Sequence, residues 1–254
     1  MHEVAEYYDK FLATRMSRYR ILGNLRLDLA KRRAKSLVAN GDVVADFGCG
    51  IGIVSEAMAS SRKGVTVIGV DASLANIEYA KRTVRNENVR FLHVDVSNGC
   101  QILANENPSG YNLITLIDVI EHIPESNRAQ VLVSLFNITK DDGYLLLTYP
   151  SPEYQSYIIS NDPEELQIID EIIESNQLLS EAWAAGWKLK EFRYVDVWRR
   201  NQYVHAIFQK CDGLFNCDKI KRNWITVVAE NSLIALLWPI RTWRYNWRLA
   251  GRKK

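Results

Sequence analysis

The bulk properties of the chain favour one ordinary globular domain with a distinct C-terminal segment. Its 254 residues are 47% apolar and 24% charged, which excludes a disordered or fibrous protein and allows one large α/β domain with a substantial core. The formal net charge is +2, but residues 218–254 carry nine Lys or Arg against two acids. This basic tail therefore carries +7, residues 1–217 carry −5, and we expect a domain boundary between them.

The N-terminus and the cysteines favour a cytoplasmic protein. Residues 1–7 mix acids with apolar residues and lack the basic start and apolar stretch of a secretory signal. The four cysteines form no C-x-x-C pair and have no His-rich segment beside them, which argues against a structural zinc site; they are Cys49, Cys100, Cys211 and Cys217.

The first forty residues predict two helices. Apolar residues recur at helical spacing among Arg and Lys over residues 3–12 and 18–38. Asn40-Gly41 then ends the second helix and precedes the first strand.

Five short apolar runs then alternate with segments of helical pattern. The expected strands cover 43–47, 65–70, 89–94, 111–117 and 143–149, and the expected helices cover 53–60, 73–86, 97–105 and 125–139. Strands that are apolar on both faces and separated by helices need crossover connections. The pattern therefore predicts a doubly wound α/β fold, with a parallel sheet covered by helices on both sides.

The rest of the domain predicts a long helical segment over 163–185, broken by Asn176, and two further strands over 187–198 and 202–209. Only three residues separate these strands, too few for a parallel crossover, so they must pair antiparallel. We expect a seven-stranded, mostly parallel, Rossmann-like sheet with an antiparallel last strand, N-terminal helices and a C-terminal helical tail.

The clearest functional signal is the loop after the first strand, Asp46-Phe47-Gly48-Cys49-Gly50-Ile51-Gly52. Alternate glycines let backbone N–H groups approach a ligand at the start of a helix. The spacing is shorter than the G-x-G-x-x-G of dinucleotide-binding loops, and Asp46 places a negative charge where a phosphate would be repelled. The loop therefore favours a ligand that bears an amino group, and Cys49 is expected to be a small packing residue within it.

Carboxylates also follow the second and third strands. Asp71 can accept hydrogen bonds from two ribose hydroxyls, and no basic residue stands beside it to bind a 2′-phosphate. Asp95 can accept a hydrogen bond from an adenine amino group. Each acid can instead cap the helix that follows, but their recurrence at successive strand ends favours one ligand site at this edge of the sheet.

This constellation resembles the class I S-adenosylmethionine-dependent methyltransferase family, over roughly residues 1–210. The resemblance implies that the loop holds the methionine part of S-adenosyl-L-methionine, that Asp71 and Ala72 bind the ribose, and that Asp95 and Val96 contact the adenine. Tyr7-Tyr8 resembles a lid helix whose tyrosines close over the cofactor. The implied cofactor residues are Asp46, Gly48, Cys49, Gly50, Gly52, Asp71, Ala72, Asp95, Val96, Asp118 and Tyr8.

The fourth strand ends in Asp118-Val119-Ile120-Glu121-His122, beside the expected sulfonium. This run resembles the D/E-V-I-E-H motif of ubiquinone-pathway O-methyltransferases and small-RNA 2′-O-methyltransferases. In such relatives the two acids and the His can bind a divalent cation with a further downstream His. Here the only downstream histidine is His205, so we expect no metal; its ligands, if one bound, would be Asp118, Glu121 and His122.

Without a metal, the best candidate general base is His122, whose ordinary pKa lies near working pH, with Glu121 beside it. The alternative is a His122 that only organises its loop. His205 and Tyr203 share a face of the last strand, where they can meet the acceptor or simply be solvated.

The segment after the fifth strand argues against methylation of a base amino group. Residues 148–154 lack the N-P-P-Y or D-P-P-Y pattern of such enzymes. We expect the helical insert 153–184 to cover an acceptor site for a hydroxyl on a small molecule, sugar or glycan, and we expect no DNA partner. The alternatives are RNA 2′-O-methylation and an S-adenosylmethionine-binding partner subunit without activity.

The tail, residues 219–254, lies outside the minimal fold. Trp224 to Ile240 is largely apolar but contains Glu230, and is short for a bilayer span. Beyond Pro239, tryptophans alternate with cations, which suits a helix on an anionic membrane surface. The alternatives are a helix docked on the domain, a dimer contact or an RNA-binding segment.

Overall fold

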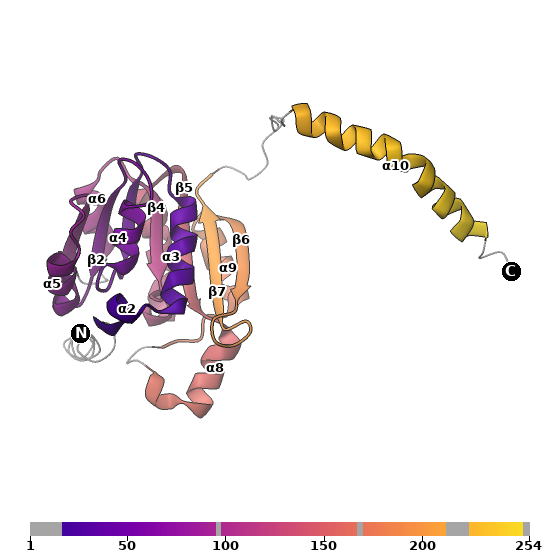
Figure 1. Ribbon diagram of the computed structural model, residues 1–254. Helices are drawn as coiled ribbons and strands as arrows, with labels where there is room; N and C mark the ends of the chain where they lie inside the picture. The colour runs from indigo at the N-terminus through magenta and orange to yellow at the C-terminus, as the bar shows by residue number, and fades with distance from the viewer. Residues whose placement is uncertain (1–16, 95–97, 167–169, 212–223, 251–254) are drawn as a thin grey trace. The chain divides into compact units, whose positions relative to one another are not determined.

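The computed structural model describes residues 17–94, 98–166, 170–211 and 224–250 (Figure 1). The expected helix 3–12, Tyr8, Asp95 and Val96 lie outside these ranges. The chain divides into two units, residues 1–214 and residues 215–254.

The first unit is built on one seven-stranded sheet of order β3-β2-β1-β4-β5-β7-β6. Its strands are β1 Val43–Phe47, β2 Thr66–Asp71, β3 Val89–His93, β4 Tyr111–Ile117, β5 Thr139–Pro150, β6 Lys188–Val195 and β7 Tyr203–Gln209. The first five strands are parallel, whereas β7 runs antiparallel to both β5 and β6. The predicted fold class is confirmed, and the antiparallel last strand of the sequence lies between two others.

Helices cover both faces of this sheet (Figure 1). α3 (Leu25–Leu37) and α4 (Ile53–Ala59) pack with one apolar cluster, and α6 (Gly99–Glu106), α7 (Glu125–Ile138) and α9 (Ser175–Ala184) pack with another. Successive strand residues alternate between the clusters, as Val44 and Ala45 do in β1. α5 (Leu74–Thr83) follows β2 and contacts β2 and β3. Burial on both sides explains the continuous apolar strands.

The expected helix 18–38 is wrong, because it is two helices, α2 (Ser17–Leu22) and α3. Gly23 has φ +76°, a left-handed conformation that ends a helix at little cost for glycine. Asn24 is extended and caps α3, since its side chain accepts a hydrogen bond from the Leu27 N–H at 3.2 Å. The break turns the start of α3 toward the carboxyl edge of the sheet.

The expected helical segment 163–185 is also wrong in its first half. A helix occurs earlier, α8 (Pro152–Asn161), within the insert expected over 153–184, and a single 3-10 turn, η3 (Pro163–Glu165), follows it. Ser151 caps α8 by accepting a hydrogen bond from the Tyr154 N–H at 3.2 Å, and Pro152 fits the first helical turn. Asn176, expected to break the helix, lies inside α9.

The second unit contains α10 (Trp224–Ala250), which is helical through Pro239. Across the parts of the chain that the structure describes, no helix combines the length and apolar character that crossing a membrane requires.

Candidate active site

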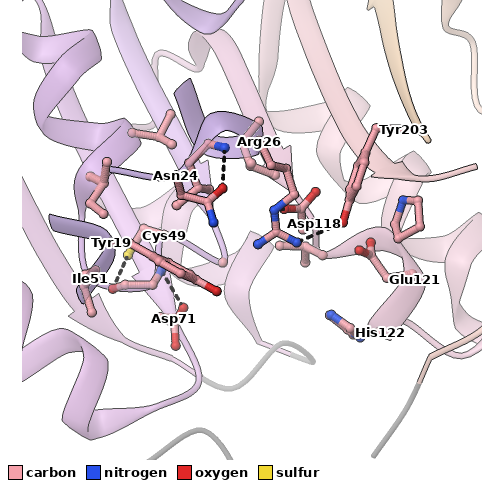
Figure 2. Close-up of a pocket in the computed structure, with 18 of the residues that line it drawn as sticks. Tyr19, Asn24, Arg26, Cys49, Ile51, Asp71, Asp118, Glu121, His122 and Tyr203 are labelled. Atoms are coloured by element: carbon pink, nitrogen blue, oxygen red, sulfur yellow. Dashed lines mark hydrogen bonds and ion pairs between the residues drawn. The ribbon is translucent and has the colours of Figure 1, made fainter. Parts of the chain in front are cut away.

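A cavity of about 430 Å³ lies at the carboxyl ends of β1, β2 and β4 (Figure 2). Most of the residues expected to bind ligand line it: Asp46, Gly48, Cys49, Gly50, Asp71, Ala72, Asp118, Glu121 and His122. Figure 2 shows Cys49 and Asp71 on one side, and Glu121 and His122 on the other. We call these sides the loop half and the β4 half.

The loop half depends on backbone conformation that only glycine adopts easily. Gly48, Gly50 and Gly52 have φ of +76°, +52° and +77°. A Cβ on Gly48 would overlap the Val119 side chain, and a Cβ on Gly52 would lie 2.5 Å from the Phe91 ring. Gly52 does not line the cavity; it is the N-cap of α4 and packs on β3.

Asp46 is buried and tied to its own framework. One carboxylate oxygen accepts a hydrogen bond from the Ser55 hydroxyl at 2.5 Å, and the other accepts one from the Thr115 hydroxyl at 2.6 Å. Burial raises the pKa of Asp46, and these two hydroxyls act against the shift. Asp46 therefore joins β1 to α4 and β4 while it lines the cavity.

Asp71 joins the glycine loop to the end of β2. Its carboxylate accepts hydrogen bonds from the Gly50 N–H at 2.8 Å and the Ser73 N–H at 2.9 Å, and from the Asn76 side chain at 3.2 Å. Burial raises its pKa, opposed by these hydrogen bonds. The sequence left open that Asp71 only caps the helix after β2. The N-cap of that helix, α5, is Ser73 and not Asp71. The two carboxylate oxygens of Asp71 retain lone pairs that can accept hydrogen bonds from ribose hydroxyls.

In the β4 half, Asp118 has a left-handed backbone, φ +55°. Its carboxylate accepts a hydrogen bond from the Thr148 hydroxyl at 3.1 Å and pairs with Arg26 Nε, also at 3.1 Å. Arg26, at the start of α3, also donates to the Tyr203 hydroxyl at 3.0 Å. Burial lowers the pKa of Arg26, but Asp118 and Tyr203 together raise it above its ordinary value. The sequence did not single out Arg26.

Glu121 lies in the 3-10 turn η2 (Ile120–His122) and is only 3% exposed. Burial raises its pKa to about 8, with neighbouring His122 acting against the shift. Its Oε2 atom has no hydrogen-bond partner among the described residues. A buried carboxyl that is protonated at neutral pH and lines a cavity can donate a hydrogen bond to a ligand.

His122 pairs with a residue that the sequence analysis missed. Its Nδ1 atom lies 3.0 Å from Asp170 Oδ1, and both side chains line the cavity. A carboxylate beside Nδ1 favours the tautomer that carries its proton on that nitrogen, and in this tautomer Nε2 is the basic atom.

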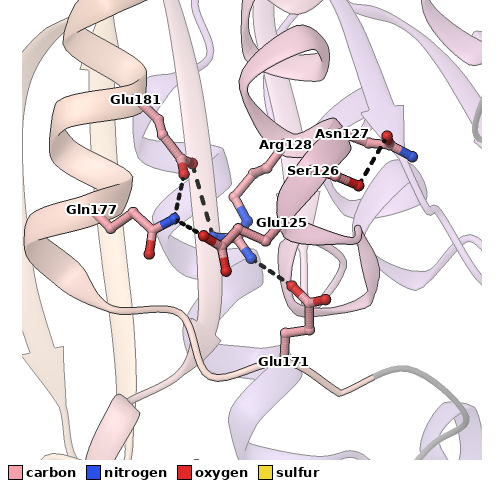
Figure 3. Close-up of polar contacts among 7 residues, drawn as sticks. All are labelled: Glu125, Ser126, Asn127, Arg128, Glu171, Gln177 and Glu181. Atoms are coloured by element: carbon pink, nitrogen blue, oxygen red, sulfur yellow. Dashed lines mark hydrogen bonds and ion pairs between the residues drawn. The ribbon is translucent and has the colours of Figure 1, made fainter.

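A buried arginine holds the segment that carries Asp170 (Figure 3). Arg128 of α7 is 1% exposed and donates to Glu171 at 2.9 Å, and Glu181 of α9 lies 3.9 Å away. The Glu171 N–H also donates to the Glu121 carbonyl at 2.9 Å. Gln177 links Glu181 to Glu125 of α7. These contacts hold Asp170, the residue before Glu171, beside η2.

Two of the three residues considered as metal ligands form ion pairs with other side chains. Asp118 pairs with Arg26, and His122 with Asp170. Within the described residues, no group of three or more His, Cys, Asp or Glu side chains has an arrangement that could hold a metal ion.

His205 lies apart from the cavity, whereas Tyr203 lines it. Both are buried, at 7% and 5% exposure, because β7 is an interior strand; the alternative that they are solvated is wrong. Burial, together with the nearby charges of Arg33 and Arg193, lowers the pKa of His205 to about 4.

The insert expected over the acceptor contributes three residues of α8 to the lining of the cavity, Tyr154, Gln155 and Ile158.

Comparisons with known proteins agree with this geometry. A family model described as a methyltransferase domain matches residues 11–204. The ubiquinone biosynthesis O-methyltransferase of Actinobacillus pleuropneumoniae is 28% identical over 141 residues, which are 55% of this chain and 58% of that protein. That of Acinetobacter baylyi is 27% identical over 179 residues, 66% and 71% of the two chains. Against three relatives of this name, the chain spans only 54% to 58% of their length.

Solved structures share the fold. The N-methyltransferase NodS from Bradyrhizobium japonicum, in complex with S-adenosyl-L-homocysteine, superposes with a TM-score of 0.62 at 13% identity, covering 82% of this chain and 98% of that one. A TehB-like S-adenosylmethionine-dependent methyltransferase from Corynebacterium glutamicum superposes with a TM-score of 0.57 at 18% identity, covering 80% and 97%. At these identities the likeness concerns the fold alone.

Proposed function

The chain belongs to the class I S-adenosylmethionine-dependent methyltransferases, and on this premise we propose that it methylates a hydroxyl on a small molecule, sugar or glycan. The observation that supports this acceptor is the His122–Asp170 pair in the β4 half. A hydroxyl must lose its proton as it gains a methyl group, so a placed base is useful.

The loop half fits the co-substrate of this family. S-adenosyl-L-methionine supplies a methyl group on a sulfonium centre. We assign Gly48, Cys49 and Gly50 to its methionine part, where the left-handed glycines keep the backbone open to a ligand, and Asp46 to the electrostatic attraction of its amino group. Asp71 and Ala72 are assigned to the ribose. Tyr8, Asp95 and Val96 keep their expected roles as proposals outside the described residues.

The β4 half provides the acceptor chemistry. His122 takes the hydroxyl proton on Nε2, and Asp170 stabilises the imidazolium that forms. Glu121, protonated at neutral pH, donates a hydrogen bond that orients the acceptor. Alignment of the acceptor with the reacting carbon supplies most of the rate in such displacements. Tyr154 and Tyr203, whose ring centroids are 6.1 Å apart, form an aromatic wall for the acceptor.

The names of the curated relatives support a hydroxyl rather than an amine as acceptor, because those proteins are called O-methyltransferases. The chains of these relatives extend well beyond the part that matches, so their names alone do not give the acceptor of this protein. The acceptor is therefore proposed from the residues that line its own cavity. The proposed setting is the cytoplasm, where the cysteines Cys49, Cys100 and Cys211 stay free thiols.

Isotope labelling tests this proposal. Cell extract is incubated with the full-length protein and S-adenosyl-L-methionine deuterated in its methyl group, and mass spectrometry identifies the labelled products. We expect a small molecule or glycan labelled on oxygen, and a much weaker signal from His122→Asn. Label on nitrogen, or only on RNA, would contradict the proposed acceptor. Calorimetric heat with a nicotinamide dinucleotide but none with S-adenosyl-L-homocysteine would refute the cofactor assignment.

A further inference from the structure

α10 forms an extended helix with a continuous apolar stripe. Positions 225, 229, 233, 236, 240 and 243 recur at intervals of three or four residues, so they share one face of the helix. Every side chain at these positions is large and apolar except Ala229. Ile225, Leu236 and Trp243 are 58%, 72% and 67% exposed. Nothing in the helix itself covers this stripe.

A row of basic positions runs beside the apolar stripe in the second half of α10. At about 100° per residue, positions 241, 244 and 248 fall on one side of the helix, and all three are Arg. No acid occurs after Glu230, so the charge of this half is uniformly positive. The sequence on either side of α10 adds six further Lys or Arg.

We propose that α10 lies on the surface of a membrane rich in anionic lipids. Its apolar stripe would enter the boundary between headgroups and acyl chains, and its Arg row would contact phosphate-bearing headgroups. Tryptophan favours this boundary, and four of the seven tryptophans of the chain are in α10. The helix lies on the surface rather than across the bilayer, because Glu230, Asn231 and Ser232 interrupt its apolar first half.

A second copy of the chain fits α10 less well. The spacing of the apolar stripe also suits helix pairing, but stable pairs set opposite charges beside the seam. In α10 the residues beside the second half of the seam are arginines, so parallel copies would bring like charges together. An anionic surface complements all three arginines, whereas a parallel copy of α10 repels them and an antiparallel copy offers only one acid, Glu230.

Vesicle sedimentation with the full-length protein tests the proposal. We expect the protein to pellet with vesicles of phosphatidylglycerol and phosphatidylcholine, to stay in solution with phosphatidylcholine alone, and to bind less as salt rises. The variant Arg241→Glu/Arg244→Glu/Arg248→Glu should lose at least about tenfold in affinity, because each reversal replaces attraction by repulsion. A matched control, Arg62→Glu/Lys63→Glu/Arg85→Glu, reverses three charges at exposed positions of the first unit and should bind as the wild type.

Four results would overturn the proposal. The first two are equal binding to both kinds of vesicle and an equal loss of binding in the control variant. The other two are a helix pair in sedimentation equilibrium and retention on RNA, each without binding to vesicles. Quenching of tryptophan fluorescence by brominated lipids provides a second measurement that needs no variant, and we expect quenching only with anionic vesicles. His122→Asn should bind vesicles normally, so the test is independent of the proposed reaction.

Discussion

In the loop half of the cavity, the lining residues come mainly from one short stretch of chain, between Asp46 and Ile51, and from Asp71 and Ala72 at the end of the next strand. In the β4 half, the facing groups are side chains brought together from η2, the start of α3, α8, β7 and the segment before α9. Local backbone conformation determines the geometry of the loop half, whereas tertiary packing determines the geometry of the β4 half. Damage to the loop half should therefore affect cofactor binding and folding together, whereas damage to the β4 half should affect the reaction and leave cofactor binding intact.

The largest expected effect is on the reaction. His122→Asn should lower kcat by about 10²–10⁴-fold, because it removes the proposed base. Binding of S-adenosyl-L-homocysteine, measured by calorimetry, should change little, since the loop half is untouched. Asp170→Asn should lower kcat less, because the base remains but loses its partner. If His122→Asn retains full activity or loses cofactor affinity, the division between the halves is wrong.

The next effect is on the loop. Gly48→Ala forces a side chain into a left-handed residue and against Val119, and should destabilise the fold by roughly 2–4 kcal/mol, with loss of cofactor binding. Gly41→Ala is a matched control, because φ is +78° there but no atom lies within 4 Å of the added Cβ. It should cost only about 1–2 kcal/mol and leave binding intact. Denaturant unfolding measures the stability of both variants, and calorimetry measures their binding of S-adenosyl-L-homocysteine. Equal losses in the two variants would mean that the contact with Val119 is unimportant.

The third effect concerns the dependence of stability on pH. The pKa of Glu121 is about 8 in the fold and ordinary in the unfolded chain, so between about pH 4.5 and 8 the folded state holds a proton that the unfolded state has released. Stability from this group therefore falls as pH rises through that window. Glu121→Gln cannot titrate, and its melting temperature should rise relative to the wild type from pH 5 to pH 8.

The control for this prediction is Glu87→Gln, at an exposed position. Its melting temperature should follow that of the wild type at both pH values. A difference between Glu121→Gln and the wild type that stays constant with pH would show that Glu121 is ionised throughout.

The same contrast explains what the sequence predicts. The strands, the helices between them and the glycine loop follow from local patterns, namely apolar runs and glycines that tolerate a left-handed backbone. The structure confirms the fold that these patterns predict. Asp170 and Arg26 were missed because each acquires its role from a partner far along the chain, His122 or Asp118. No local pattern indicates such a pair.

Two errors had a local signal that was outweighed. Gly23-Asn24 is a typical helix stop followed by a cap, but the apolar spacing on both sides suggested one continuous helix. Ser151-Pro152 is a typical helix start and agrees with the expected insert over 153–184, but the apolar spacing suggested that the helix itself covers 163–185. His205 was placed in the site by strand alternation, which gives the face of a sheet but not the distance from a cavity.

The segment 170–174 reaches its place through the Glu171 N–H and the buried guanidinium of Arg128, and it forms no ladder with the sheet. Ile173 of this segment is buried in the larger apolar cluster, whereas Asp170 lines the cavity. Exchanging residue 170 alone, with Glu171 and Ile173 kept, would give a chain that keeps its methyl donor while the group beside His122 is replaced. Acceptor choice becomes a property that engineering, or evolution, can alter separately from cofactor use.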